Sequence, residues 1–366
     1  MAGQGPLAGL RVVEFVSIGP GPHCAMLLAD LGADVLRIDR EGGNGWFNPI
    51  ADRGRASVTV DIRSEQGRAF CLDATQHADV LIEGSRPGVM ERLGLGPDEL
   101  LAGNPRLIYG RVTGWGQTGP LAQTAGHDID YIALTGALAA MGKPGEPAAV
   151  PLNLVGDFGG GSMLLATGIL AALWERERSG RGQVVDAAIV DGVSSLMTMF
   201  AGLLPSGRIS LDRDKNVLGG AAPFYRCYRC ADGRELAVGC LEQKFFETLL
   251  ERLGLSQYAS CRDRTETWSE LREVLERTFA SRDQAHWIEL FAGSDACVAP
   301  VLSLEEAMEH PHLTARQTYV EHAGLRQAAP APRFSRTPGA IRASSEAGAM
   351  LEEWRSTKFL EADDGR

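Results

Sequence analysis

The chain has 366 residues, of which 44% are hydrophobic and 23% are charged, and its formal net charge is −11 at pH 7. This length suffices for two or three domains with buried cores, and the ordinary composition excludes a fibrous or disordered protein. The acidic balance argues against a nucleic-acid-binding surface, which needs clustered lysine and arginine, but it allows a small anionic ligand held by a few local arginines.

The ends of the chain and its apolar stretches predict a cytoplasmic protein with no membrane partner. The N-terminal segment lacks a basic region followed by a long apolar region, so we expect no secretory signal. The apolar stretch at 163–174 is too short to cross a bilayer, and residues 361–366 do not form a peroxisomal address.

The seven cysteines are scattered and odd in number, which is typical of reduced thiols. Cys227 and Cys230 have the spacing of a zinc or redox site, but a zinc site needs two further ligands at suitable spacing. Residues 231–240 instead resemble a strand–turn–strand that ends at Cys240. We therefore expect no metal.

The first half of the chain alternates between apolar strands and amphipathic helices. A β-branched strand, a Gly/Pro turn, a short helix and a second strand follow one another at 10–15, 16–23, 24–32 and 33–39. Further strands are predicted at 58–62, 78–84 and 105–114, with helices such as 64–77 between them. This alternation predicts an α/β fold: a Rossmann-like parallel sheet with flanking helices.

The second half contains a long helix, a strand and then a region of different character. The helix is predicted at 157–178 and the strand at 182–193. Short strands at 225–230 and 235–240, helices at 242–255 and 267–293, and a strand at 297–304 indicate a smaller α+β domain. A Pro/Ala-rich segment at 328–340 predicts an extended linker before a C-terminal helix. The predicted organisation is a large domain at 1–190 completed by 335–366, a linker at 191–222, a small domain at 223–320 and a linker at 321–334.

The loop at 18–23 lies between a strand and a helix, where dinucleotide-binding folds place their phosphate loop. The glycine fingerprint fails at its third position, which is Cys24, so binding of NADP is a weak alternative. Asp39 and Arg40 end the second strand, where a ribose and a phosphate would bind in such a fold. Arg40 is a candidate ligand for another phosphate, or else a member of a surface ion pair.

Four further positions are candidates for chemistry or anion binding. Arg86 and Arg92 flank a Pro-Gly turn after a strand, where they either bind an anion or are solvated. A histidine side chain can take up and return a proton at physiological pH, so His127 can act as a general base, although an isolated loop histidine is more often structural. Asp157 lies in the first turn of a helix, as either an N-terminal cap or a catalytic carboxylate beside free amides.

Glycines 159–161 would let a ligand approach the backbone of the same helix closely, which an ordinary cap does not require. Glu242 begins a helix of the small domain, and its simplest role is that of a helix N-terminal acid.

Together these segments closely resemble the α-methylacyl-CoA racemases of the CoA-transferase family III superfamily. The resemblance runs through nearly the whole chain and includes GPGPHCAMLLADLGADVLRIDR, ADVLIEGSRPGVMERLGLGP, LIYGRVTGWGQTGP, AGHDIDYIALTG, LNLVGDFGGGSM and GQVVDAAIVDG. The early motifs mark the superfamily, whereas the pairing of GHDI with VGDFGGGS is specific to the racemases.

The resemblance implies that His127 and Asp157 are the catalytic pair, supported by Glu242. It implies that an acyl-CoA thioester is the substrate and that no further cofactor is needed. The implied CoA-binding residues are Ile18, Arg40, Val60, Asp61, Ile62, Arg63, Gly84, Ser85, Arg86, Arg92, Gly126, Asp128, Ile129, Asp130 and Tyr131. The chain departs from the family at Asp130, where an asparagine is expected, and an extra carboxylate near the thioester would disfavour an enolate.

The resemblance also implies an interlocked homodimer, with Glu242 across the dimer interface from His127. In that family the reaction interconverts (2R)- and (2S)-2-methylacyl-CoA by proton transfer to and from the α-carbon. Two alternatives remain: a CoA-transferase that uses Asp157 as a nucleophile, or a non-catalytic acyl-CoA-binding protein. The acyl group stays open; Met141, Met163, Met197 and Met199 could line an acyl surface or belong to cores.

Overall fold

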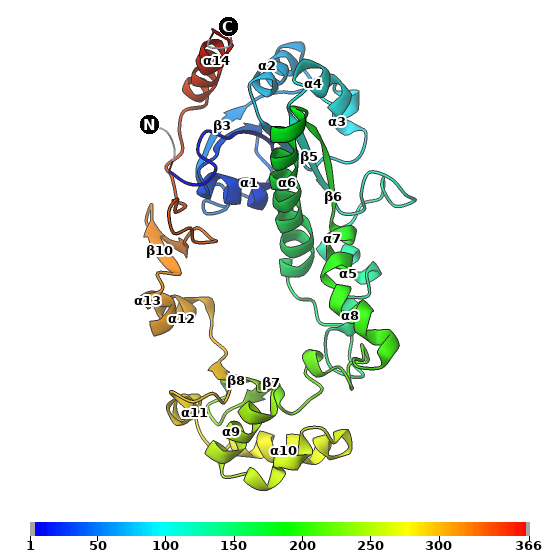
Figure 1. The fold of residues 1–366 in the computed structure, drawn as a ribbon, viewed down its shortest axis with the longest axis vertical. Coiled ribbons are helices and arrows are strands. Elements are labelled where there is room, and N and C mark those ends of the chain that lie inside the picture. Colours follow the sequence, from blue (N-terminus) through cyan, green and yellow to red (C-terminus); the bar gives the residue numbers. More distant parts are fainter. Residues whose placement is uncertain (1–3, 364–366) are drawn as a thin grey trace. The chain divides into compact units, whose positions relative to one another are not determined.

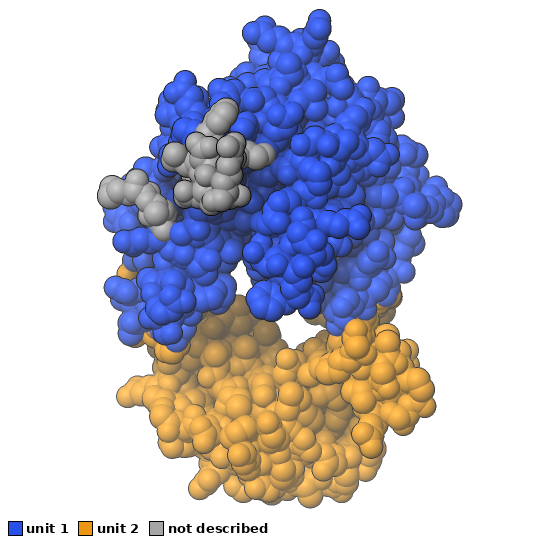
Figure 2. Space-filling model, turned by 45° about the horizontal axis from the view of Figure 1, so that its top comes forward, with its two compact units in different colours: residues 1–135, 151–196, 314–366 blue, residues 136–150, 197–313 orange. Residues whose placement is uncertain are grey.

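The computed structural model describes residues 4–363 and divides into two compact units, coloured separately in Figure 2. The first unit comprises residues 1–135, 151–196 and 314–366, and the second comprises 136–150 and 197–313. Residues 136–150, predicted as part of the large domain, thus group with the second unit, and 314–334 group with the first. The predicted linker boundaries themselves stay predictions.

The first unit is built on a six-stranded sheet in which every pairing is parallel. Its strands, in chain order, are β1 (Arg11–Phe15), β2 (Asp34–Asp39), β3 (Arg55–Thr59), β4 (Val80–Glu83), β5 (Ile108–Thr113) and β6 (Gln183–Ala188). The spatial order β3-β2-β1-β4-β5-β6 is that of a Rossmann sheet, which confirms the predicted α/β architecture. Because the order reverses between β1 and β4, ligands are expected outside the carboxyl ends of these two strands.

Helices cover both faces of this sheet (Figure 1). The helices of this unit are α1 (Pro20–Asp30), α2 (Glu65–Gln76), α3 (Val89–Arg92), α4 (Pro97–Gly103), α5 (Asp128–Leu134), η2 (Leu154–Ser162), α6 (Met163–Ser179), α7 (Ile189–Leu196) and α14 (Ala347–Asp363). Of these, α5 packs against η2 and α7 rather than on the sheet. Side chains alternate between the faces of a strand, so Val13 packs in a core with α2, α4 and α14, whereas Val12 packs in a core with α1 and α6. The remaining elements of the C-terminal segment are the end of α13 (Pro311–Ala315), which begins in the second unit, and the hairpin of β10 (Tyr319–His322) and β11 (Leu325–Ala328).

Several predicted elements of the first unit have different bounds in the structure. The strand predicted at 58–62 ends at Thr59, and the strand predicted at 182–193 ends at Ala188, where α7 begins. The helix predicted at 157–178 begins at Leu154, and its first nine residues are the π-helical segment η2. The helix at 154–179 is long and apolar enough to cross a bilayer, so the prediction from the shorter stretch 163–174 underestimated its length. The core helix of a globular fold has the same properties, and α6 packs on β5 and β6.

The second unit has its own core around an antiparallel sheet of β7 (Tyr225–Arg229), β8 (Glu235–Gly239) and β9 (Val298–Pro300). Its α-helices are α8 (Thr198–Leu203), α9 (Gln243–Leu253), α10 (Trp268–Phe279), α11 (Gln284–Phe291) and α12 (Leu304–Glu309), and its 3-10 turns are η1 (Leu138–Ala140), η3 (Leu204–Ser206), η4 (Val217–Gly219), η5 (Ser256–Cys261) and η6 (Thr265–Thr267). The single helix predicted at 267–293 is two helices, because the chain turns at 280–283 and α11 begins anew.

The cysteines of both units are free thiols. Among residues 4–363 no group of three or more His, Cys, Asp or Glu side chains is arranged to hold a metal ion.

Candidate active site

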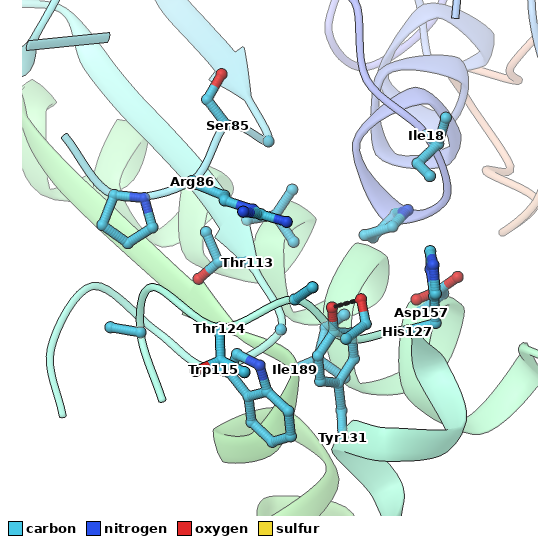
Figure 3. Close-up of a pocket in the computed structure, with 18 residues that line it drawn as sticks. Ile18, Ser85, Arg86, Thr113, Trp115, Thr124, His127, Tyr131, Asp157 and Ile189 are labelled. Carbon is cyan, nitrogen blue, oxygen red and sulfur yellow. Dashed lines mark hydrogen bonds between the residues drawn. The ribbon is translucent and has the colours of Figure 1, made fainter. Parts of the chain in front are cut away.

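A cavity of about 300 Å³ opens at the carboxyl ends of β1, β4 and β5, where the reversal of strand order predicts a ligand (Figure 3). We call it cavity 1. Its walls come from the segment after β1, the loop after β4, the end of β5 and the start of α5. The predicted site residues that line it are Ile18, Gly84, Ser85, Arg86, Gly126, His127, Tyr131 and Asp157. Residues far apart in the sequence therefore meet here, and both members of the predicted catalytic pair are among them.

A second cavity of about 370 Å³, cavity 2, is lined by Ile18 and Asp157 as well. Its other walls include His23 of α1 and the loop residues Asn44 and Trp46. The carboxylate of Asp157 is thus accessible from two compartments of the same unit. The sequence analysis did not predict cavity 2. The loop after β2 does carry Asn44, Trp46 and Asn48, which line this cavity and are of the polar and aromatic kinds found in ligand sites.

His127 lies at the N-terminal cap of α5 in an extended backbone conformation. Its backbone N–H group donates to Oδ2 of Asp130 at 2.9 Å. The preceding loop is held by Tyr131, whose hydroxyl donates to the carbonyl of Gly126 and whose ring meets Trp115 edge-on at 4.8 Å. The side chain of Asp130 therefore has a structural use in capping the helix, one that an asparagine oxygen would also serve.

Asp157 is half-buried in η2, and its surroundings favour the protonated form. Burial raises the pKa of its carboxyl group, and the nearby charge of Asp128 raises it further. A hydrogen bond from Nδ2 of Asn153 at 3.4 Å and the proximity of His127 act in the opposite direction. The raised pKa makes the ionised carboxylate a stronger base than an exposed aspartate, and the protonated group can return the proton as an acid.

The amide groups beside Asp157 are not free, contrary to the sequence-based expectation. The N–H group of Asp157 donates to Oδ1 of Asp128 at 2.6 Å, and that of Gly156 also bonds to this carboxylate. Glycines 159–161 do not face a ligand either: Cβ atoms built on Gly160 and Gly161 would lie 2.7 Å from Val193 and 2.9 Å from Pro20. These glycines allow η2 to pack closely against α7 and α1.

The start of α1 is unsuited to a pyrophosphate. Pro20 and Pro22 carry no N–H group, so the first turn lacks two of the donors that a phosphate loop supplies. Gly19, at φ 69°, lies against Asp157: a Cβ there would be 2.9 Å from Oδ2. The carboxyl group of Asp157 repels a phosphate at this helix end whenever it is ionised, which argues against the NADP alternative.

The loop after β4 carries Arg86 into cavity 1 and is held by buried charges. The carboxylate of Glu83, which is fully buried, accepts the N–H of Ser85 at 2.6 Å. Arg111 pairs with Glu83 at 3.0 Å and with Glu91 at 2.8 Å. The sequence analysis did not predict this role of Glu83 and Arg111, because the position of a charged residue in an apolar strand does not reveal which residue it pairs with.

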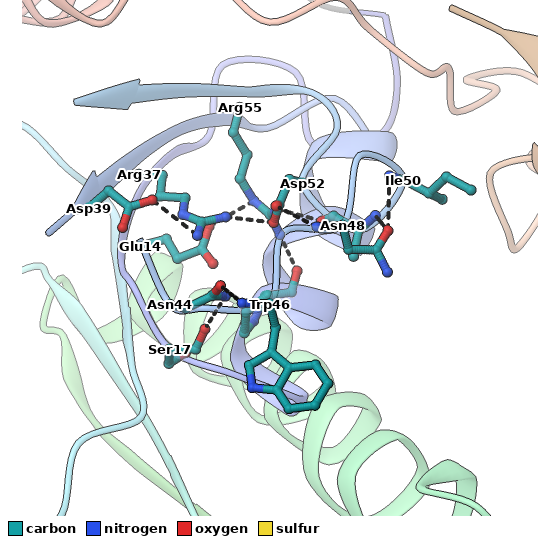
Figure 4. A network of polar contacts seen from close by, with 12 residues as sticks. Glu14, Ser17, Arg37, Asp39, Asn44, Trp46, Asn48, Ile50, Asp52 and Arg55 are labelled. Atoms are coloured by element: carbon teal, nitrogen blue, oxygen red, sulfur yellow. Dashed lines mark hydrogen bonds and ion pairs between the residues drawn. The ribbon is translucent and has the colours of Figure 1, made fainter. Parts of the chain in front are cut away.

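A second buried network anchors the loop that walls cavity 2 (Figure 4). Arg55 and Glu14, both fully buried, pair at 2.7 Å, and Arg37 reaches Asp52 at 2.5 Å. From the same loop, Nδ2 of Asn44 donates to the carbonyl of Ser17 at 3.0 Å, next to Ile18 (Figure 4). The wall shared by the two cavities is thereby tied to the sheet.

The other predicted site residues lie at several places. Arg40 follows β2, and its Nε donates to the carbonyl of Gly43 at 2.7 Å. Residues 60–63 connect β3 to α2. Arg92 is the last residue of α3. Ile129 is 40% exposed on α5. Glu242 is an exposed residue of the second unit at the N-terminal cap of α9. Their predicted roles in CoA binding or catalysis stay predictions.

Comparison with known proteins supports the resemblance. The chain matches CoA-transferase family III over residues 7–346. It is 44% identical over 334 residues to the alpha-methylacyl-CoA racemase of Mus musculus, covering 91% of this chain and 87% of that protein. The racemase of Homo sapiens is 43% identical over 318 residues, covering 86% and 82%. A CAIB/BAIF family protein from Brucella suis matches in structure with a TM-score of 0.81 and 27% identity, covering 96% of this chain and 100% of that chain.

Proposed function

The chain belongs to CoA-transferase family III, and on this premise we propose that it is a racemase that interconverts (2R)- and (2S)-2-methylacyl-CoA thioesters. The observation that carries the proposal is the presence of two different acid/base groups, His127 and Asp157, on the wall of one cavity. The similarity to two mammalian racemases over most of both chains supports it.

The chemistry follows from the weak acidity of the α-proton of a thioester. Inversion requires removal of this proton from one face of the α-carbon and delivery of another to the opposite face. In one direction the ionised Asp157 removes the proton and protonated His127 supplies the other. In the reverse direction neutral His127 is the base and protonated Asp157 is the acid. Each group is expected to contribute about 10²–10⁴ to the rate.

The enolate oxygen formed between these steps needs hydrogen-bond donors that are already in place. The amides at the start of η2 are bonded to Asp128 and do not fill this role. The amides of Asp128 and Ile129, directly after His127, have no acceptor within their own helix, whereas the amide of Asp130 is bonded to the carbonyl of His127 at 2.8 Å. We therefore assign the enolate oxygen to the start of α5.

The two cavities suit the two parts of such a substrate. Arg86 is the cation of cavity 1 and would meet the phosphates or the pantetheine of CoA there. With Asp157 at the junction, the acyl group would extend into cavity 2, past Ile18 and Trp46. The α-carbon would then lie between the two acid/base groups.

Other parts of the proposal rest on the family resemblance. We propose that the protein is an interlocked homodimer, that Glu242 of one copy supports Asp157 of the other, and that the enzyme acts in the cytoplasm. Sedimentation equilibrium of the full chain tests the dimer, and a purely monomeric species would contradict it.

A CoA-transferase that uses Asp157 as a nucleophile is the competing function within the family. His127 distinguishes the two, because a transferase needs no base at the α-carbon. The test is incubation of a single enantiomer of a 2-methylacyl-CoA with the enzyme in D₂O, followed by chiral separation and mass spectrometry. Appearance of the opposite enantiomer with deuterium at the α-carbon is expected. Transfer of CoA to an added carboxylic acid without α-deuteration would establish the transferase instead.

A further inference from the structure

Asp128 follows His127 directly in the sequence, yet its side chain turns away from cavity 1. It is 9% exposed, and its Oδ1 accepts the N–H of Asp157 at 2.6 Å. The N–H of Gly156 bonds to the same carboxylate. The resemblance predicts Asp128 as a CoA contact, but in the structure its carboxylate accepts hydrogen bonds from the backbone of η2, the segment that carries Asp157.

The contact is close enough to constrain the residue type of its partner. A Cβ built on Gly156 would lie 2.2 Å from Oδ1 of Asp128, so only glycine leaves room for the carboxylate. The other oxygen, Oδ2, is buried and has no hydrogen-bond partner among the described residues. Burial of a carboxylate is costly unless its hydrogen bonds compensate for it, so the bonds to η2 hold this side chain in place.

We propose that Asp128 is a positioning residue that fixes the backbone of Asp157 to the first turn of the helix that begins at His127, and so sets the spacing of the two proton-transfer groups. The proposal rests on the racemase function. The physical reason is that acid/base catalysis depends steeply on geometry, and a displacement of about 1 Å costs roughly 10²-fold in rate. One side chain links two elements that are 29 residues apart in the sequence.

The charge of Asp128 has a second consequence for catalysis. Asp157 is faced by Asp128, His127 and Tyr131 from α5, by Asn153 from its own segment and, across cavity 2, by His23 from α1. Of these, Asp128 is the anion that raises the pKa of Asp157. Removing its charge while keeping an acceptor oxygen should therefore lower that pKa without releasing the backbone.

Two variants separate these effects. Asp128→Asn keeps an oxygen acceptor, and kcat for α-proton exchange should stay within about tenfold of the wild type, with the acid limb of the pH profile moved to lower pH. Asp128→Ala removes the acceptor, and kcat should fall about 10²-fold while KM and the Kd for CoA stay unchanged. A fall in CoA affinity that parallels the fall in kcat would overturn the proposal and make Asp128 a ligand contact. Unchanged kcat in Asp128→Ala would overturn it as well.

Hydrogen–deuterium exchange supplies a readout that does not depend on activity. Peptides that cover residues 154–162 should exchange about tenfold faster in Asp128→Ala and like the wild type in Asp128→Asn. If Asp128→Ala does not fold, the pH profile and exchange of Asp128→Asn remain decisive, and a wild-type acid limb in that variant contradicts the charge effect. A wild-type enzyme without α-proton exchange would refute the racemase function, whereas equal protection of 154–162 in all variants would refute the link itself.

Discussion

Gly19, the residue that precedes α1, lies directly against the carboxylate of Asp157: a Cβ on Gly19 would be 2.9 Å from Oδ2. The glycine also has φ 69° and ψ −114°, a conformation that other residues rarely adopt. The glycine-rich turn after β1 therefore contacts the acid/base group that lines the same cavity as His127, and the first strand–helix unit takes part in the site without contributing a reactive side chain.

Replacement of this glycine tests the contact. Gly19→Ala should lower kcat for α-proton exchange about 10²-fold, because the added methyl group displaces the Asp157 carboxylate. Gly293→Ala is the matched control, since Gly293 has φ 67° and nothing within 4 Å of its Cβ position. Both variants should lose unfolding free energy from backbone strain, by about 1 kcal/mol or more, because each places a Cβ atom at a positive φ. Equal activity of the two variants in steady-state assays would contradict the contact.

Arg86 is expected to bind the CoA portion of the substrate. Arg86→Ala should weaken CoA binding about tenfold, with a smaller effect on kcat, because a charge-assisted hydrogen bond is lost outside the reacting atoms. Isothermal titration with CoA measures this change. Arg178→Ala, at the exposed end of α6, should bind CoA like the wild type. Equal Kd values for CoA in the Arg86→Ala and Arg178→Ala variants would contradict the assignment.

The buried pair of Arg111 and Glu83 holds the loop after β4, which carries Arg86. Arg111→Leu leaves the Glu83 carboxylate buried without its partner and should reduce the unfolding free energy by about 3 kcal/mol. Arg106→Leu breaks an exposed ion pair with Glu177, at 3.4 Å, and should cost less than about 1 kcal/mol. Urea denaturation compares the two. A similar small loss in both variants would show that the buried pair is not what holds the loop.

The raised pKa of Asp157 has a consequence for the pH dependence of the reaction. In the productive enzyme one of the two groups, His127 or Asp157, is protonated and the other is not. The pH profile of kcat/KM for α-proton exchange should therefore be bell-shaped for either enantiomer. Activity falls when both groups are protonated, and because burial raises the pKa of Asp157, the acid limb should lie above the pH at which an ordinary aspartate titrates. An acid limb at the ordinary value, measured with either enantiomer, would contradict the buried environment of Asp157.

Much of the fold follows from local patterns. Buried strands such as β1 and β4 are short apolar runs between turns, and their alternation with helices predicts the parallel sheet and its ligand-binding edge. His127 and Asp157 were identified through motifs, and the sheet brings them to one cavity. The break between α10 and α11 was missed because one helical periodicity continues on both sides of it.

The contacts that shape the site are not visible in local patterns. Asp128 looks like part of a binding motif, and its bond to the amide of Asp157 depends on the packing of α5 against η2. Gly160 and Gly161 suggest access for a ligand, whereas their neighbours are the helices α7 and α1. Such contacts between distant segments arise only when the whole unit is folded, so composition and spacing do not reveal them.

The most direct test of the two-base reaction uses His127→Ala and Asp157→Asn, each incubated in D₂O with each pure enantiomer of a 2-methylacyl-CoA. If one group serves each face of the α-carbon, each variant loses racemisation but still exchanges the α-proton of one enantiomer, and the enantiomer differs between the two variants. α-Deuterium content, measured by mass spectrometry in the recovered thioester, is the readout. Exchange of both enantiomers by His127→Ala together with exchange of neither by Asp157→Asn would contradict the two-base mechanism.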